Sequence, residues 1–273
     1  MRLPLVLAAV MALADPLSAQ VAPRADGQAT PYREVTNSPV PCPPLAILSH
    51  GFGGSEAELP QLAAMLAERG FRVIVMGHRE SGPAQLRAVR AAPDRWAAIV
   101  AAAGDPAAHR ARFLDLDAVW AMATATCRPD FALMAGHSMG AQTTIMEAGA
   151  VARFGPAGRN RFDAYVALSP QGVGQRFSPG AWAGITRPVL MVTGTRDMGV
   201  DGDYTTRLSA FDGLPGGNKR LAVISGATHF NLGGRGFGPV ALVPRLVSDW
   251  LDDLDDERLD IPQPVPGVTF RQK

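Results

Sequence analysis

The sequence predicts a single α/β domain with a mostly parallel central sheet and helices on both of its faces. Short apolar runs recur along the chain, and glycine-rich or polar loops and helical patterns follow them. At 273 residues, the chain is long enough to bury one substantial core. The net charge of +1 shows no basic or acidic bias, so nothing indicates nucleic acid or an anionic membrane surface as a partner.

Residues 1–19 are predicted to be a secretory signal peptide. Met1-Arg2 is a basic start, residues 3–14 are apolar, and Leu17-Ser18-Ala19 is a plausible cleavage site. The alternative is a membrane anchor, but about twelve apolar residues are fewer than the roughly 20 that span a bilayer. We therefore expect a secreted or periplasmic protein with no stable membrane insertion after cleavage of the signal. Residues 20–44, rich in proline and polar groups, are expected to form an extended lead-in.

The main domain is predicted over residues 45–254, and its elements follow from apolar periodicity. Residues 55–58 have the pattern of a capping box, and Leu59, Leu62 and Leu66 then form one helical face that ends at Gly70. Asp105-Pro106 starts a second helix. Strands are expected over 45–48, 73–76, 131–135, 163–168, 189–192 and 221–224, and further helices over 141–153 and up to 250–254. The Pro-rich tail, residues 255–273, is expected to pack loosely.

The pentapeptide Gly136-His137-Ser138-Met139-Gly140 lies between a predicted strand and a predicted helix. In a G-x-S-x-G turn of this kind, the two glycines allow a sharp turn that exposes the serine hydroxyl as a nucleophile. The alternative is an ordinary tight turn, but the strand before it and the helix after it favour the nucleophile.

A serine hydroxyl needs a base and an orienting carboxylate, and the sequence supplies both after Ser138. Asp197 and His229 each follow a predicted buried strand. Ligands bind at the carboxyl ends of such parallel strands, so we expect all three side chains on one rim of the sheet. Asp201 and Asp203 are the competing acids, and the alternative for both is turn chemistry around Gly202.

Four other histidines are present, but none follows both Ser138 and a strand-end acid. They are His50, His78, His109 and His137. The glycine-rich loop 49–54 is expected to provide an oxyanion hole through the Phe52 amide, together with the Met139 amide. A plain turn or a phosphate cradle is the alternative for this loop, but the Gly-Lys-Ser/Thr ending of a P-loop is absent.

Three segments, 49–54, 136–140 and 193–197, resemble the α/β-hydrolase superfamily, and the likeness extends over about residues 45–250. They are similar to dienelactone-hydrolase-like, platelet-activating-factor-acetylhydrolase-like and cutinase-like polyester esterases. Dienelactone hydrolases use a cysteine nucleophile, so Ser138 departs from them and dienelactone is not inferred as substrate. The resemblance implies an α/β-hydrolase fold. Because only residues 32–36 could supply an early strand, one or both N-terminal edge strands are expected to be missing.

The resemblance also places Cys42 and Cys127 before two neighbouring parallel strands. In an exported protein this implies a Cys42–Cys127 disulfide on the edge opposite the site, and the alternative is two buried thiols. A pocket is expected from Phe52, Met139, Trp182, Met198 and Phe230, although each could be ordinary packing. Whether residues 78–108, with Trp96, form a small cap is left open. No cationic clamp for an acidic substrate is evident, although Arg79 and Arg196 are expected near the rim.

The function predicted from these residues is a serine hydrolase that cleaves carboxylic esters with short- to medium-chain or aromatic acyl groups. The substrate is a small-molecule or polymeric ester, and no metal or organic cofactor is expected. Two alternatives remain open. One is an amidase or peptidase with the same triad, and the other is a non-catalytic binding protein on the same scaffold.

Overall fold

The computed structural model describes residues 20–256 and 262–273. The predicted signal peptide, residues 1–19, lies outside this range. Within the described residues, none of the helices is both long and apolar enough to cross a membrane.

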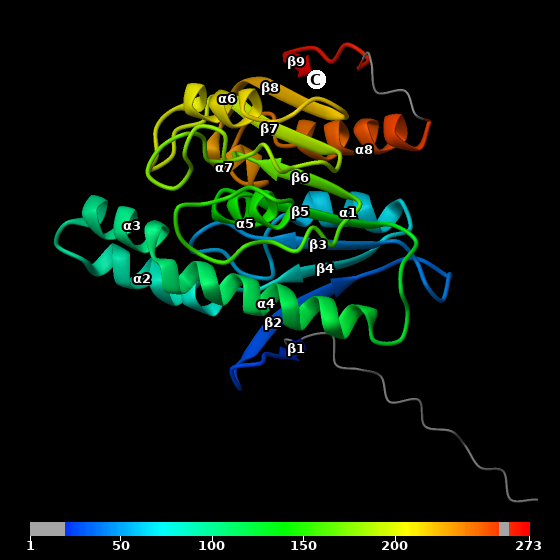
Figure 1. The fold of residues 1–273 in the computed structure, drawn as a ribbon, viewed down its shortest axis with the longest axis horizontal. Helices are drawn as coiled ribbons and strands as arrows, with labels where there is room; N and C mark the ends of the chain where they lie inside the picture. The colour runs from blue at the N-terminus through cyan, green and yellow to red at the C-terminus, as the bar shows by residue number, and fades with distance from the viewer. Residues whose placement is uncertain (1–19, 257–261) are drawn as a thin grey trace, which may run out of the picture.

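A single mixed sheet forms the centre of the described part of the chain, with its nine strands in the order β1-β2-β4-β3-β5-β6-β7-β8-β9 (Figure 1). The strands from β4 to β8 in this order are parallel, whereas β1, β2 and β9 run antiparallel to their neighbours. The predicted α/β-hydrolase fold is thereby confirmed. The strands are β1 (Gln20–Pro23), β2 (Ala29–Val35), β3 (Leu45–Ser49), β4 (Arg72–Met76), β5 (Ala132–His137), β6 (Ala164–Leu168), β7 (Val189–Arg196), β8 (Lys219–Thr228) and β9 (Val268–Gln272).

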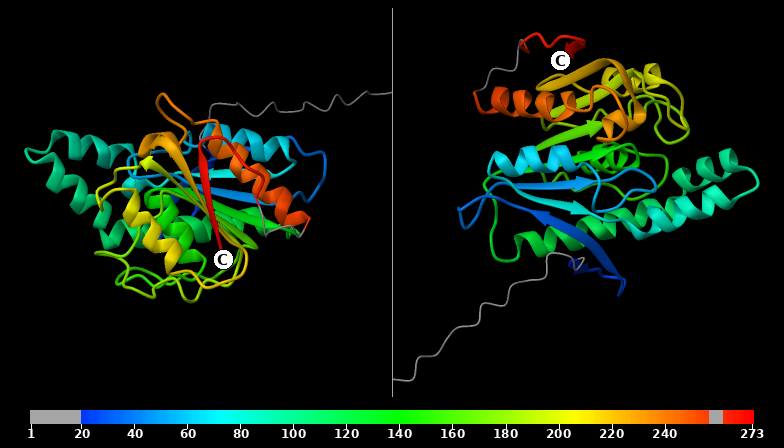
Figure 2. Two further views of the ribbon diagram at one scale, coloured as in Figure 1. Left: turned by 90° about the horizontal axis from the view of Figure 1, so that it is seen from above. Right: turned by 180° about the vertical axis from the view of Figure 1, so that it is seen from behind.

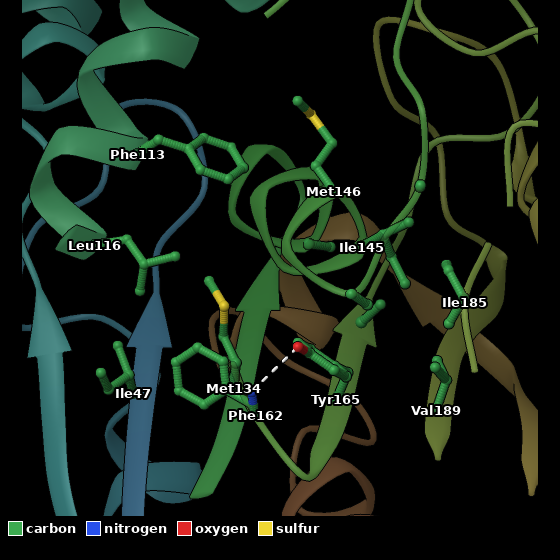
Figure 3. Close-up of a cluster of buried hydrophobic side chains, with 14 of the residues drawn as sticks. Ile47, Phe113, Leu116, Met134, Ile145, Met146, Phe162, Tyr165, Ile185 and Val189 are labelled. Atoms are coloured by element: carbon green, nitrogen blue, oxygen red, sulfur yellow. Dashed lines mark hydrogen bonds between the residues drawn. The ribbon is translucent and has the colours of Figure 1, made fainter. Parts of the chain in front are cut away.

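Helices cover both faces of the sheet and bury a separate apolar cluster on each (Figures 1 and 2). On one face, α4, α5 and α6 pack over side chains such as Ile47, Met134 and Tyr165 (Figure 3). On the other face, α1 and α8 pack over the alternate side chains of the same strands. The helices are α1 (Pro60–Glu68), the short 3₁₀ turn η1 (Arg79–Ser81), α2 (Pro83–Ala91), α3 (Arg95–Gly104), α4 (Pro106–Thr124), α5 (Met139–Glu147), α6 (Tyr204–Asp212), α7 (His229–Leu232) and α8 (Leu242–Asp255).

The sheet is not trimmed at its N-terminal edge, so that expectation was wrong. The segment 20–44 supplies both β1 and β2, which pair as an antiparallel hairpin beside β4. The outer strand has four residues and contains Pro23, which an edge strand tolerates because one side of its backbone needs no partner. So short a strand has no clear apolar periodicity, and the sequence therefore did not reveal it.

The C-terminal tail also belongs to the sheet, contrary to the loose packing expected for it. Strand β9 pairs antiparallel with β8, with Phe270 opposite Ala222. Its side chains alternate between half-buried and exposed, as expected for an edge strand that covers little of the core. The proline-rich segment before it hid this pattern in the sequence.

Two predicted helix boundaries were wrong as well. Helix α1 begins at Pro60 instead of after Ser55, whose hydroxyl accepts a hydrogen bond from the Ala57 amide in a turn. Proline suits the first helical position because its φ is already helical and its missing N–H would have had no partner there. Helix α5 ends at Glu147, before Gly149, which has a φ of +119°.

Candidate active site

Ser138 occupies a sharp turn between β5 and α5, with φ of 55° and ψ of −116°. The glycines on either side are required by close backbone packing. A Cβ atom at Gly136 would lie 2.3 Å from the carbonyl oxygen of Gly140, and one at Gly140 would lie 2.0 Å from that of Ser49. Both distances are far below van der Waals contact, so only glycine fits at either position. This local structure is the strand–turn–helix context that a nucleophile elbow requires.

The side chains of Ser138, His229 and Asp197 form one hydrogen-bonded chain. His229 Nε2 lies 3.0 Å from Ser138 Oγ, and His229 Nδ1 lies 2.8 Å from Asp197 Oδ1. Each of the three residues directly follows the carboxyl end of a strand, namely β5, β8 and β7. The arrangement can pass the serine proton to the imidazole while the carboxylate holds the opposite ring nitrogen.

The Asp197 carboxylate is buried and held by more partners than the sequence suggested. Oδ1 accepts a hydrogen bond from Ser169 Oγ at 3.0 Å, and Oδ2 accepts one from Thr193 Oγ1 at 2.8 Å. Burial raises the pKa of Asp197, but the hydrogen bond and charge of His229 lower it, as do Arg207 and Ser169, and the lowering prevails. The carboxylate is therefore ionised and fixed in orientation at neutral pH.

Sequence reasoning assigned no role to Ser169 or Thr193, although both left a signal. Ser169 directly follows β6, at the same edge of the sheet as the three site residues. Thr193 lies four residues before Asp197, within the segment that resembles the superfamily. Neither signal was specific enough to assign a contact.

His137 also supports the site, in a role that sequence reasoning missed. Its Nε2–H donates a hydrogen bond to the backbone carbonyl of His229 at 2.9 Å, and the two rings lie 4.8 Å apart. Burial, assisted by His229, lowers the pKa of His137 to about 3. The ring is therefore neutral at neutral pH and anchors the start of α7, on which His229 stands.

The competing acids have other partners. Asp201 forms an ion pair with Arg207, and Asp203 caps α6 by accepting a hydrogen bond from the Thr205 amide at 3.0 Å. The turn around Gly202, closed by backbone hydrogen bonds with Gly199, agrees with the turn chemistry expected there.

A second hydrogen-bonded Ser–His–Asp chain includes Ser49 at the start of the glycine-rich loop. His78 Nε2 lies 2.9 Å from Ser49 Oγ, and His78 Nδ1 lies 2.8 Å from Asp115 Oδ2. All three side chains are buried, and none lines the cavity that contains Ser138. Burial lowers the pKa of His78 well below its usual value, so the ring is neutral. We interpret this second hydrogen-bonded chain as structural.

The loop 50–54 is anchored at two points beside Ser138. Arg112 Nη1 donates to the carbonyl of His50 at 2.8 Å, and the Gly53 amide donates to the carbonyl of Ser81 at 2.8 Å. Phe52 and Met139 both line the cavity next to Ser138. Within residues 20–256 and 262–273, neither of their amides donates to a protein acceptor, so both are available to an oxyanion.

The cavity at Ser138 has a volume of about 440 Å³. Phe52, Met139, Met198 and Phe230 line it, as the sequence predicted. Trp182 does not, and this prediction was wrong. Its ring is fully buried and packs against Phe177, with 5.2 Å between the two ring centroids, on the core side of the loop between β6 and β7.

Helices α2 and α3 form a small cap over the cavity and settle the question left open for residues 78–108. In Figure 1 the two helices project beyond the carboxyl ends of the parallel strands. Leu86 and Arg90 of α2 and Trp96 and Ile99 of α3 line the cavity. Trp96 is 63% exposed, so it stands at the mouth and not in the core.

The predicted Cys42–Cys127 disulfide is present. It joins the segments that precede β3 and β5, at the amino-terminal ends of these parallel strands, whereas Ser138 follows the carboxyl end of β5. Among the described residues, no cluster of three or more His, Cys, Asp or Glu side chains could hold a metal ion.

Solved structures of similar fold include hydrolases and esterases. One, described as a dienelactone hydrolase from Klebsiella pneumoniae, is 19% identical with a TM-score of 0.62, and the match covers 89% of this chain and 98% of that one. Est1E from Butyrivibrio proteoclasticus is 18% identical with a TM-score of 0.60, covering 87% and 99%. A cold-adapted esterase from an Arctic intertidal metagenomic library is 17% identical with a TM-score of 0.61, covering 89% and 93%.

No protein-family model and no curated protein sequence matches the chain. At these identities the similar structures establish the architecture alone. The chain therefore has the α/β-hydrolase fold.

Proposed function

We propose that this protein is a serine hydrolase that cleaves carboxylic esters through Ser138, His229 and Asp197. The observation that carries the proposal is the hydrogen-bonded chain of 3.0 Å and 2.8 Å that joins these three side chains. It ends at a serine in an elbow conformation that opens into a cavity. The esterases and the hydrolase of similar fold support the same reaction class.

In the first half of the reaction, His229 Nε2 removes the proton from Ser138 Oγ as that oxygen attacks the ester carbonyl. The carbonyl oxygen becomes negative and is stabilised by the amides of Phe52 and Met139. Asp197 keeps the Nδ1 proton on the side away from the serine and stabilises the imidazolium that forms. The imidazolium then gives its Nε2 proton to the leaving alcohol, and the acyl group remains on Ser138.

In the second half, a water molecule takes the place of the alcohol. His229 removes its proton, the water oxygen attacks the acyl carbonyl, and the same two amides stabilise the oxyanion. The proton returns from His229 to Ser138 Oγ as the carboxylic acid leaves. The carboxylate of Asp197 stays ionised throughout, consistent with its lowered pKa.

The walls of the cavity support an apolar or aromatic acyl group of modest length. Phe52, Trp96, Met198 and Phe230 supply apolar surface, and the α2–α3 cap limits the space above Ser138. Est1E, which has this fold, is recorded with ferulic acid bound, so an aromatic acid fits a site on this architecture. We infer a short- to medium-chain or aromatic acyl group.

We also propose that the protein is secreted or periplasmic. The signal-like N-terminus and the Cys42–Cys127 disulfide support export, because disulfides persist in oxidising compartments. N-terminal sequencing of the protein recovered from culture medium and periplasm checks this. A mature N-terminus near residue 20 is expected, and an uncleaved chain in the cytoplasm would contradict it.

The test of the proposed activity is hydrolysis of p-nitrophenyl esters from acetate to palmitate, together with methyl ferulate. Wild type is compared with Ser138→Ala, and Ser178→Ala, at a half-buried serine that does not line the cavity, serves as the control. Activity at short to medium chains or on ferulate, lost only in Ser138→Ala, is expected. No turnover of any ester, or equal turnover by Ser138→Ala, contradicts the proposal. A fluorophosphonate that fails to label wild type would favour a binding protein on this scaffold.

A further inference from the structure

A second cavity of about 360 Å³ adjoins the one that contains Ser138. Its far wall is formed by Phe154 and by residues 172–176 of the segment between β6 and β7. A substrate that extends from Ser138 in this direction would enter it, because the two cavities have part of their walls in common. The residues that line both are Ala103, Gln142, Gln171, Val200 and Asp201.

Arg176 lines this second cavity with a guanidinium group that lacks an ionic partner among the described residues. The residue is only 7% exposed, and its Nε and Nη1 atoms are buried without a hydrogen bond. Its Nη2 lies 3.6 Å from the sulfur of Met146, and the Phe154 ring lies 4.3 Å from the guanidinium carbon. Burial lowers the pKa of Arg176 to about 10, so the group is still positively charged at neutral pH.

The other buried arginines of the described chain show how unusual this is. Arg24, Arg207 and Arg220 each form an ion pair with a carboxylate, namely Asp115, Asp201 and Asp253. Arg112 forms no ion pair with another described residue, but it donates hydrogen bonds to Ser81, Ser49 and the His50 carbonyl, and the charge of Asp115 favours its charged form. A buried charge without a counter-ion is costly, so proteins pair it or use it. The contacts of Arg176 with an aromatic ring and a sulfur atom leave two of its donors unused.

Building on the esterase activity proposed above, we propose that the second cavity is a subsite for an anionic group of the substrate. The Arg176 guanidinium binds a carboxylate that the ester carries at a distance from the scissile bond. A guanidinium N–H makes a strong charge-assisted hydrogen bond to a carboxylate oxygen, and Arg176 has two unused donors for it, Nε and Nη1. The one acidic side chain that lines both cavities, Asp201, already has its charge compensated by Arg207.

Two neighbours of Arg176 fit this assignment. Gln171, on the wall common to both cavities, has a buried Oε1 without a hydrogen-bond partner, and rotation of its amide presents an N–H₂ donor to the same ligand. Phe154 is half-buried in a loop outside the helices and strands, and its ring shields the guanidinium from water. A small shift of this ring would give a carboxylate oxygen access to one of the unused donors, Nε or Nη1.

The sequence did not suggest this residue. The two arginines expected near the rim, Arg79 and Arg196, line neither cavity. Arg176 lies in an irregular segment, and only the folded structure shows that its charge is buried and unpaired.

The test compares acidic esters with neutral esters of the same length. One set consists of p-nitrophenyl half-esters of dicarboxylic acids with four to ten carbons, each paired with its methyl-capped analogue, so that the acid is on the acyl side. The second set consists of butyrate esters of ω-hydroxy acids and their methyl esters, so that the acid is on the alcohol side. In one of the two sets, at one chain length, the kcat/KM of wild type should be roughly tenfold to a hundredfold higher for the acidic member than for the neutral member. The difference should come from a lower KM, as expected for a hydrogen bond to a charged group.

Arg176→Met should abolish this preference, and Arg176→Lys should restore part of it. Arg153→Met, a change at an exposed arginine of the neighbouring loop, is the matched control and should keep the wild-type ratio. Equal or better use of the neutral member by wild type at every length in both sets overturns the proposal. So does an Arg176→Met variant that lowers kcat/KM equally for acidic and neutral members.

A binding measurement separates this proposal from the esterase proposal. Free C4–C10 dicarboxylates are added to Ser138→Ala and to Ser138→Ala/Arg176→Met, and the thermal unfolding midpoints are recorded. A ligand-dependent increase that requires Arg176 supports the subsite even if no ester is hydrolysed. Hydrolysis of neutral esters by wild type, with no such increase, leaves the esterase intact and rejects the subsite. If Arg176→Met does not fold, Arg176→Lys and the wild-type preference still decide.

Discussion

The hydrogen bond from Thr193 to Asp197 allows a quantitative test of how the site is held. Oδ2 of Asp197 has two close partners, Thr193 Oγ1 at 2.8 Å and Arg207 Nε at 3.7 Å, and the second distance is too long for a hydrogen bond. Thr193→Val keeps the shape of the side chain and removes the donor. Hydrogen bonds to charged groups contribute about 1.5–3 kcal/mol, so the free energy of unfolding should fall by about that amount at pH 7.

The same loss should raise the pKa of Asp197, because the hydroxyl stabilises the charged carboxylate more than the protonated acid. The native pKa of Asp197 is lowered, so the stability it contributes is fully present above its unfolded pKa and is lost as the pH falls through its folded pKa. The destabilisation by Thr193→Val should therefore be full at pH 7. It should become smaller in strong acid, because Asp197 is then protonated in both wild type and the variant.

Urea unfolding of wild type, Thr193→Val, Asp197→Asn and the double variant measures the coupling. In the Asp197→Asn background the hydroxyl keeps an acceptor without charge, so Thr193→Val should cost only about 1 kcal/mol. The exposed Thr186→Val serves as the control and should have no comparable effect. A cost for Thr193→Val that is the same in both backgrounds would refute the view that this hydroxyl acts on the charge of Asp197.

Three further outcomes follow from packing, covalent structure and burial. Gly140→Ala places a Cβ atom 2.0 Å from a backbone carbonyl and should prevent stable folding, whereas Gly104→Ala, with open space around it, should be tolerated in thermal unfolding. Reduction of the disulfide, with sequence separation 85, should lower the free energy of unfolding by about 4–5 kcal/mol in urea titrations with and without reductant. Burial lowers the pKa of four histidines, so unfolding takes up protons below the unfolded pKa of about 6.5. The free energy of unfolding should be highest above that pH and should fall as the pH decreases toward the folded pKa values, by up to about 1.4 kcal/mol per pH unit for each histidine. A urea midpoint that does not change from pH 7 to pH 5 would contradict this. The four are His50, His78, His109 and His137.

Much of the fold could be predicted because its central strands are buried on both faces. Such strands are continuous apolar runs, as in residues 45–48 and 189–192, and they can be recognised without any knowledge of their neighbours. The edge strands β1 and β9 could not be recognised in this way. Each is short and mostly exposed or half-buried, and its extended form depends on pairing with a strand that is distant in the chain.

In the candidate site, too, the features with a local signal could be predicted and those that depend on distant contacts could not. Ser138, Asp197 and His229 could be named because each follows a recognisable strand, and the carboxyl ends of parallel strands meet at one edge. Trp182 was misplaced because proximity in sequence to a site loop does not say which way a side chain turns. Here the ring enters the core beside Phe177.

The sequence by itself determined the order of the central strands, the elbow, and the strand-end acid and base, and its resemblance to the superfamily implied the Cys42–Cys127 pair. These features depend on local geometry or on the topology of a parallel sheet, and both are written in short segments. Only the tertiary structure decided which groups hold Asp197, which helices cap the cavity, and which buried arginine has no counter-ion among the described residues. Contacts and burial of this kind arise between segments far apart in the chain. Their energies depend on distance and desolvation, which no local pattern of residues encodes.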